Sequence, residues 1–265
     1  MTGAGAVIVF ALPGLAPPAT AAGMKFDFRP PAIMGDLYRA AGEKPAAILL
    51  LNGVFETAPA VRHKEILWAL SQGVPVFGAA GIGALRAVEL AAHGMIGLGR
   101  IYDAYAAGLV ARDDAVAALY RLSGVAPVRA SEPLVNIQAT IAKAAAAGII
   151  AAATGQQLEA IAAALFFKLR AYDRLLAEAE AAGLDRREIE RLRAWIPGEA
   201  TDLQRQDAEL ALAAISDRGA KSSDAPAIGF ALERTASWKK LCAGAEAATA
   251  LSSWHSAGNG MVTIA

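Results

Sequence analysis

The sequence contains little cysteine and no excess of either charge. Cys242 is the only cysteine among 265 residues, so no disulfide can form within the chain and no pair of cysteines can bind zinc. The 25 basic residues balance the 25 acidic ones, so the overall positive field that attracts nucleic acid is missing. We therefore expect a protein of the reducing cytoplasm that does not bind nucleic acid.

Long apolar segments are missing as well. A membrane-spanning helix needs roughly 18 unbroken apolar residues, and the longest apolar run, residues 144–154, is bounded by Lys143 and Gln156. We expect no membrane attachment. The first 22 residues contain a short apolar stretch that resembles a signal peptide, but they lack the positive segment that precedes such a stretch. We interpret it as a buried first strand.

Hydrophobic residues make up 55% of the chain, enough to form a substantial core. Short apolar runs at residues 6–10, 46–51 and 74–77 have the length of strands buried on both faces. Amphipathic helical patterns cover residues 63–70 and 84–94, and a glycine ends the second of them. This alternation predicts an α/β fold with a Rossmann-like, mainly parallel sheet in the N-terminal half, flanked by helices.

The second half of the chain has a different pattern, typical of helices. Apolar residues at three- and four-residue steps predict one long helix over residues 156–182. Two further helices are predicted over residues 186–195 and 201–215, separated by Pro197-Gly198. The C-terminal half is therefore expected to be mostly α-helical.

This change of pattern predicts a division of the chain. We expect an α/β core over residues 1–130 and a mainly helical region over residues 131–265 that packs on this core. Ser131 is expected to cap the first helix of the second region, with Pro133 in its first turn. Residues 216–227 are small and polar and are the best candidate for a flexible connection.

The chemistry of open α/β sheets gathers at the carboxyl ends of the strands. Asn52 and Gly53 follow the second predicted strand, and a glycine-rich loop at residues 78–83 follows the third and leads into a helix. Such a loop could hold an anion with its backbone amides, or it could be no more than a tight turn. Its spacing is not GxGxxG, which makes nucleotide binding the weakest interpretation.

Two groups of charged residues lie near the predicted helices. Lys64 stands at a helix start, where the helix dipole disfavours cations. It is either solvated or a functional lysine that partly buried neighbours make a general base. Arg86 and Glu89 can form a surface ion pair. His93 and His255 are isolated, so a metal site is not supported, and nothing indicates a bound cofactor.

Longer motifs follow one another along the first half of the chain. They are PPAIMGDLY at residues 30–38, HKEILWAL at 63–70, GALRAVEL at 83–90, the acidic pair Asp113-Asp114, and SEPLVNI at 131–137. With these motifs in this order, from about residue 6 to residue 140, the chain resembles the TfuA-like family. Beyond Ile150 we identify no motif.

The resemblance implies a role in peptide modification. TfuA-like proteins are partners of YcaO enzymes, which use ATP to activate a peptide backbone amide so that sulfur replaces its oxygen in the biosynthesis of modified peptides (RiPPs). Family members are described as hydrolysing the C-terminal thiocarboxylate of a ThiS-like sulfur carrier to release sulfide, and as helping YcaO to engage its peptide. Their site is hydrolase-like, with a serine and a lysine.

The family pattern can be placed on this sequence residue by residue. The serine expected from GAASMGALRAAEL falls at Gly81, which has no nucleophile. Lys64 matches the lysine of the HKE motif, and its place beside the strand ends suggests that it is the base. Asn52 stands where family members commonly carry aspartate, and Arg86 and Glu89 match the pattern. These five positions form the candidate catalytic site.

Gly81 leaves four interpretations open. In the first, the chain has lost hydrolysis and kept binding. In the second and third, the missing serine is replaced by another hydroxyl, with Ser131 as the first candidate, or by water that Lys64 activates. In the fourth, the glycine is an introduced change. Two functions therefore remain. One is a hydrolase that frees sulfide for YcaO, and the other is a non-catalytic adaptor that binds YcaO and the sulfur carrier.

Overall fold

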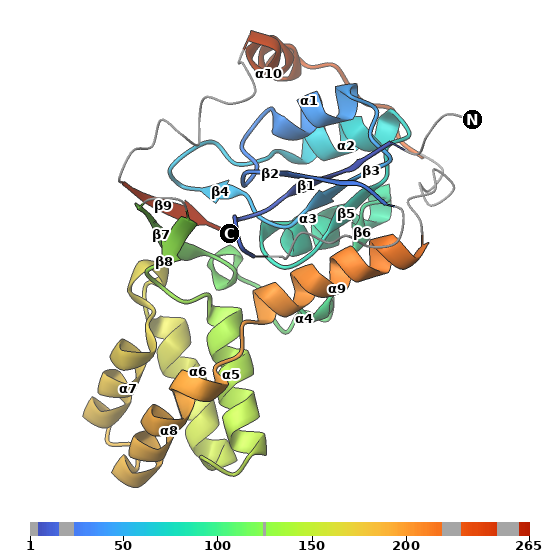
Figure 1. Cartoon of the computed structure of the whole chain (residues 1–265). Coiled ribbons are helices and arrows are strands. Elements are labelled where there is room, and N and C mark those ends of the chain that lie inside the picture. Colours follow the sequence, from blue (N-terminus) through green and yellow to red (C-terminus); the bar gives the residue numbers. More distant parts are fainter. Residues whose placement is uncertain (1–4, 16–23, 124–125, 219–228, 248–259) are drawn as a thin grey trace.

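A five-stranded parallel sheet forms the centre of the N-terminal half (Figure 1). The computed structural model describes residues 5–15, 24–123, 126–218, 229–247 and 260–265. In spatial order the strands of this sheet are β2 (Phe26–Arg29), β1 (Val7–Phe10), β3 (Ala47–Leu50), β5 (Val76–Gly78) and β6 (Ile96–Gly97). Every pairing is parallel, and β1 and β3 are buried along their whole length. The predicted α/β fold is confirmed.

Three helices connect these strands on one face of the sheet. They are α1 (Asp36–Gly42), α2 (His63–Ser71) and α3 (Ile82–Leu90). The three connections run from β2 past β1 to β3, from β3 to β5 and from β5 to β6. Because all three run in the same direction across the sheet, right-handed crossovers place the three helices on the same side. The helix predicted to run to Gly94 leaves the α conformation at Leu90 and ends in one 3-10 turn, Ala91–His93.

A second, antiparallel sheet lies beside the first. Its spatial order is β4 (Val54–Phe55), β9 (Met261–Ile264), β7 (Ala118–Ser123) and β8 (Ala126–Arg129). β9 comes from the far end of the chain and pairs with β4 and β7 at once. None of these four strands was predicted from the sequence, because they are short or partly polar.

The opposite face of the parallel sheet is covered by α9 (Leu203–Arg218) (Figure 1). Apolar side chains of α9, such as Leu212, share a core with Val7 and Leu49. Asp207 of α9 accepts hydrogen bonds from the amides of Arg100 (3.0 Å) and Ile101 (2.7 Å), at the start of α4 (Arg100–Ala106). This carboxylate supplies the acceptors that the first turn of α4 lacks.

The helices α5 (Leu134–Ala146), α6 (Ala152–Ala164), α7 (Tyr172–Ala181) and α8 (Arg186–Glu199) pack together beyond the second sheet (Figure 1). The prediction of a single helix over residues 156–182 is wrong. The chain becomes extended at Leu165, with ψ of 136°, and passes through a 3-10 turn, Phe167–Leu169, before α7. The apolar spacing continues across the break because Phe167 is also buried in the core.

Two smaller helix predictions also need correction. Pro197 and Gly198 do not separate helices but lie in the last turn of α8. Ser131 does not cap α5, because Pro133 stands at the cap position and the Ser131 hydroxyl accepts a hydrogen bond from the Leu119 amide, 2.8 Å away. A serine before a proline therefore predicted the place of the helix but not the partner of the hydroxyl.

One more helix, α10 (Ala236–Ala247), packs on α1 (Figure 1). Trp238 of α10 lies against Tyr38 and Trp68. Of the predicted connection at 216–227, residues 216–218 end α9 and the rest lie outside the described residues. The division at residue 130 stays a prediction. Within the described ranges, no helix is long and apolar enough to cross a membrane.

Candidate functional site

The ends of β1, β3 and β5 meet at one rim, and Asn52 is the side chain at its centre. Asn52 is buried, and its Oδ1 accepts a hydrogen bond from the Leu12 amide, 3.2 Å away. The backbone amide of Asn52 donates a hydrogen bond to the Phe10 carbonyl, 3.1 Å away. The side chain of Asn52 therefore ties the end of β3 to the loop after β1.

Gly81 lies against this asparagine and against the last described strand. A Cβ atom added to Gly81 would be 2.8 Å from Asn52 Nδ2 and 2.5 Å from the carbonyl carbon of Ala265. Ala265 is itself buried and exchanges two backbone hydrogen bonds with Gly53, of 2.8 and 3.0 Å. The place where the resemblance expects a serine side chain is therefore filled by backbone of this chain.

The glycine-rich loop has a structural explanation. The amides of Gly81 and Gly83 both donate to the Leu51 carbonyl, at 3.1 and 3.4 Å, so they are turned away from any bound anion. A Cβ on Gly83 would lie 1.7 Å from the Leu50 carbonyl oxygen. The glycines thus let α3 approach β3 closely, and this geometry favours the tight turn over the anion-holding loop.

Lys64 stands on the first turn of α2 and contacts α10. Its Nζ donates to Thr235 Oγ1 at 3.3 Å, and that hydroxyl also accepts from the Trp238 amide at 3.3 Å. Within the described residues, no hydrogen bond connects Lys64 to Asn52 or Gly81. The structure therefore does not bring the expected base and the expected nucleophile position into direct contact.

Arg86 and Glu89 form a separate cluster with His63. Glu89 Oε2 lies 2.5 Å from Arg86 Nη1 and 2.8 Å from His63 Nε2, on a partly exposed surface between α3 and α2. Water and salt screen such a pair, which contributes little to stability. The surface ion pair considered for Arg86 and Glu89 is thus present, with a histidine added.

Glu65, in the same motif as Lys64, was missed as a key residue. It is buried, and its carboxylate accepts hydrogen bonds from the amides of Gly35 (2.7 Å) and Arg62 (3.1 Å). Burial raises the pKa of Glu65 to about 7. Glu65 joins the PPAIMGDLY loop to the start of α2, and its place three residues after the helix cap was the available signal.

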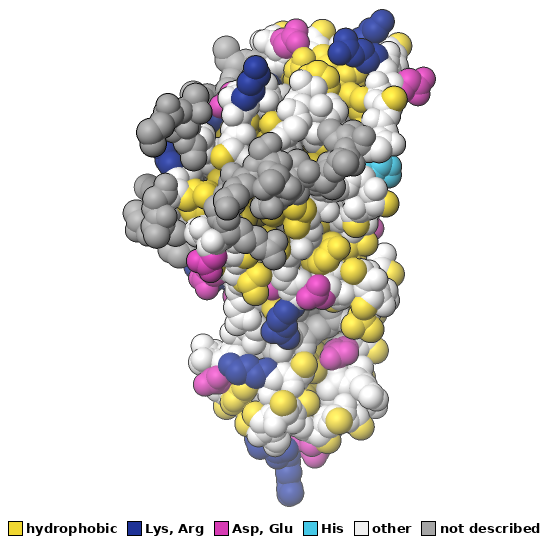
Figure 2. Space-filling model, turned by 90° about the vertical axis from the view of Figure 1, so that its right-hand side faces the viewer, with side chains coloured by type: hydrophobic (Ala, Val, Ile, Leu, Met, Phe, Trp, Pro, Cys, Tyr) yellow, Lys and Arg dark blue, Asp and Glu magenta, His cyan; other side chains and the backbone are white. Residues whose placement is uncertain are grey.

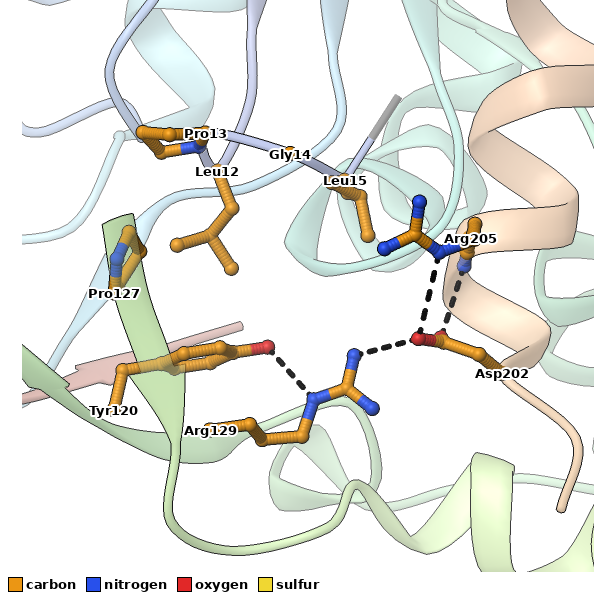
Figure 3. A pocket seen from close by; sticks show the side chains of 9 residues that line it. All are labelled: Leu12, Pro13, Gly14, Leu15, Tyr120, Pro127, Arg129, Asp202 and Arg205. Atoms are coloured by element: carbon orange, nitrogen blue, oxygen red, sulfur yellow. Dashed lines mark hydrogen bonds and ion pairs between the residues drawn. The ribbon is translucent and has the colours of Figure 1, made fainter. Parts of the chain in front are cut away.

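A pocket of about 230 Å³ opens next to this rim (Figure 3). It is lined by Leu12, Pro13, Gly14, Leu15, Tyr120, Pro127, Arg129, Asp202 and Arg205. The pocket adjoins the rim through Leu12, whose amide binds Asn52. Residues 12–15 belong to the loop after β1, and the other lining residues come from β7, β8 and the start of α9.

Arg129 of this pocket is paired with acidic side chains of the protein itself. Arg129 donates to Asp202 at 2.8 Å, to Glu132 at 3.1 Å and to the Tyr120 hydroxyl at 3.2 Å. Although burial opposes it, Tyr120, Glu132 and Asp202 together raise the pKa of Arg129. Arg129 therefore holds the β7–β8 hairpin to the start of α9, which leaves the pocket suited to an uncharged or weakly polar group.

The remaining sequence candidates give no metal centre. In the ranges that the structure describes, no three His, Cys, Asp or Glu side chains are grouped so that they could hold a metal ion. His93 packs edge-on against Phe230, and His255 lies outside the described residues. On the face shown in Figure 2, Lys and Arg are scattered among Asp and Glu, with hydrophobic side chains between them.

The fold and the rim define an α/β protein with a Rossmann-like sheet whose strand ends are closed by a second, antiparallel sheet. The model of the TfuA-like protein family matches residues 52–171. The matched segment begins at Asn52 and contains Lys64, Gly81 and Ser131, so the resemblance is confirmed there. A search of curated proteins finds no match to the chain.

Proposed function

We propose that this protein is an accessory protein of peptide thioamidation by a YcaO enzyme, and that it binds the tail of a thiocarboxylated ThiS-like carrier without cleaving it. The TfuA-like match supports the first part, since resemblance to that family implies association with a YcaO enzyme. The second part rests on one observation at the rim. Gly81 offers no nucleophile and has Ala265 backbone where a side chain would stand.

The other groups near the rim agree with binding without hydrolysis. Asn52 is neutral and uses its oxygen on the Leu12 amide, so it is not a base. The Ser131 hydroxyl is buried and accepts a hydrogen bond within the β7–β8 region. Lys64 donates to Thr235. A serine hydrolase needs a nucleophile and a base within hydrogen-bond reach. Among the described residues no such pair lies at Gly81, because the hydroxyl that Lys64 contacts is that of Thr235.

Hydrolysis remains the second candidate function because the family match spans the positions of the expected serine and lysine. Water activated by Lys64 would be its mechanism in this chain. This candidate requires Lys64 to leave Thr235 and approach the rim, and it predicts that sulfide release disappears in Lys64→Ala.

The proposal is tested by reconstituting thioamidation with a YcaO enzyme, its peptide and ATP. Sulfide is supplied either free or as the thiocarboxylated carrier. An adaptor is expected to raise the rate of thioamidation with either sulfur source. The Lys64→Ala variant is expected to raise this rate as much as the unmodified protein does. A protein that raises the rate only with the carrier, and loses this effect in Lys64→Ala, supports hydrolysis instead. No effect with either source would refute the accessory role.

A further inference from the structure

The strand β9 occupies a slot between two edges of the molecule. Ile264 pairs with Val54 of β4, and Thr263 pairs with Phe55 on one side and with Leu119 of β7 on the other. Both neighbours belong to the family-matched part of the chain, whereas β9 lies far outside it. Extended peptides bind to proteins by adding a strand to an open sheet edge, and without β9 both β4 and β7 would present such an edge.

The slot ends at the candidate site and accepts only a small residue there. The two hydrogen bonds between Ala265 and Gly53 continue the strand pairing to the rim. The Ala265 carbonyl carbon lies 2.5 Å from the position that a Gly81 Cβ would take, and Ala265 is 1% exposed. An extended segment in this slot therefore places the carbonyl group of its last bound residue at position 81, beside Asn52.

Three of the four side chains of β9 are buried. Val262 and Ile264 are buried in the core shared with α9, while Met261 is half exposed. Thr263 is fully buried, but its hydroxyl has no hydrogen-bond partner among the described residues. A buried hydroxyl without a partner is unfavourable, so the resident strand is not the best possible occupant of the slot.

We propose that this slot is a binding site for an extended peptide tail that ends in a small residue, and that Met261–Ala265 is its exchangeable resident occupant. A partner protein supplies the tail, which displaces β9 and brings its last carbonyl group to Gly81. This inference rests on the proposed function only for the identity of the partner, the sulfur carrier. The slot itself is defined by β4, β7 and Gly81.

The first test uses the unmodified protein. Amide hydrogen exchange under native conditions measures how each strand opens. If β9 is exchangeable, its amides exchange through a local opening that leaves the amides of β1 and β3 protected. If the β9 amides exchange only together with those of β1 and β3, the strand is a permanent part of the core and the proposal is overturned.

The second test uses a labelled peptide with the sequence of residues 260–265, and Ile264→Ala to weaken the resident strand. Fluorescence anisotropy is expected to show binding. Replacing Thr263→Val in the peptide removes the unpartnered hydroxyl and is expected to tighten binding about tenfold. Replacing Ala265→Trp in the peptide is expected to weaken binding at least tenfold, because residue 265 is buried and a large side chain does not fit there. Equal binding of all three peptides would contradict the slot.

A locked variant provides the matched control. Val54→Cys and Ile264→Cys, combined with Cys242→Ser, join β4 and β9 at a pair that does not exchange hydrogen bonds. The oxidised form is expected to bind no peptide, and reduction of the same sample is expected to restore binding. Peptide binding that is unaffected by oxidation would place the peptide elsewhere and overturn the proposal.

The carrier separates this inference from the proposed function. If the peptide exchanges but a thiocarboxylated ThiS-like carrier does not compete with it, the slot stands and the assignment of the carrier fails. If the carrier binds the locked and unlocked forms equally and the peptide binds neither, the slot is refuted and the proposed function stands.

Discussion

The parallel sheet and the antiparallel sheet of this protein are built from very different kinds of sequence. β1 and β3 are short and wholly apolar, so local pattern determines where they form. β4 has two residues, and β9 reaches it from the other end of the chain. The candidate site lies where the two sheets meet, at Gly53 and Ala265. Long-range pairing, rather than local pattern, therefore shapes the site.

The largest effect is expected from breaking the parallel sheet at its contact with α3. Gly83→Ala places a Cβ 1.7 Å from the Leu50 carbonyl oxygen, so helix and strand must separate. We expect a loss of about 3 kcal/mol or more in the free energy of unfolding. Denaturant unfolding measures it, with Gly198→Ala as the matched control because no atom lies near that position. A stable Gly83→Ala protein would contradict the close packing.

The next effect tests the link between the α/β part and the four-helix part. Arg170 is fully buried and donates to Asp114 Oδ2 at 2.8 Å and to its carbonyl at 2.7 Å. Arg170→Leu leaves the Asp114 carboxylate without this partner and is expected to cost about 3 kcal/mol. Arg174→Leu removes an exposed ion pair with Glu178 and is expected to change stability by less than about 0.5 kcal/mol. Equal effects of the two changes would contradict this account.

A smaller effect is expected where the two sheets meet. Gly81→Ser puts a side chain against the Ala265 backbone, so β9 must shift or leave its slot. We expect a loss of about 2 kcal/mol and faster hydrogen exchange of the β9 amides. Gly198→Ser is the control for adding a serine at an uncrowded glycine. If Gly81→Ser left stability and β9 exchange unchanged, Ala265 would not occupy the rim.

The smallest effect is a dependence on pH at the buried Glu65. Its pKa is raised from 4.5 to about 7, so between these values the folded state keeps a proton that the unfolded state releases. Stability therefore falls as the pH rises from about 4.5 to 7, by at most about 1.4 kcal/mol per pH unit, and is constant above that range. Glu65→Gln cannot titrate, so it is expected to flatten this slope. The free energy of unfolding of both proteins, measured at pH 5, 6 and 7, checks this prediction. If it changed with pH equally in Glu65→Gln and in the unmodified protein, Glu65 would already be ionised at pH 5.

The parallel sheet could be predicted from the sequence better than the antiparallel sheet. Strands β1, β3 and β5 and helices α2 and α3 could be predicted because each is an uninterrupted local pattern, and Asn52 and Gly81 could be placed at strand ends for the same reason. The edge strands β2 and β6 and the short helix α1 were not predicted, because β2 is partly polar and β6 and α1 are short. The break after α6 could not be predicted, because Phe167 and Arg170 are buried without helical structure. Nor could β9, whose partners are distant in the chain.

The candidate site shows the limit of motif reasoning. The motif gave the position of Gly81 but not its neighbour Ala265, which lies outside the family match. It suggested Lys64 as a base, whereas the structure pairs Lys64 with Thr235. Glu65, beside it in the motif, has clear structural contacts with Gly35 and Arg62. A motif residue can thus hold loops together as well as perform chemistry.

The most direct test of the central claim is sulfide release from a thiocarboxylated ThiS-like carrier, followed by mass spectrometry of the carrier. If the chain binds the carrier tail without cleaving it, the carrier stays thiocarboxylated and sulfide does not rise above the level of the carrier alone. Conversion of the carrier to its carboxylate by the unmodified protein, lost in Lys64→Ala, would contradict the account and establish a hydrolase that works without a serine at position 81.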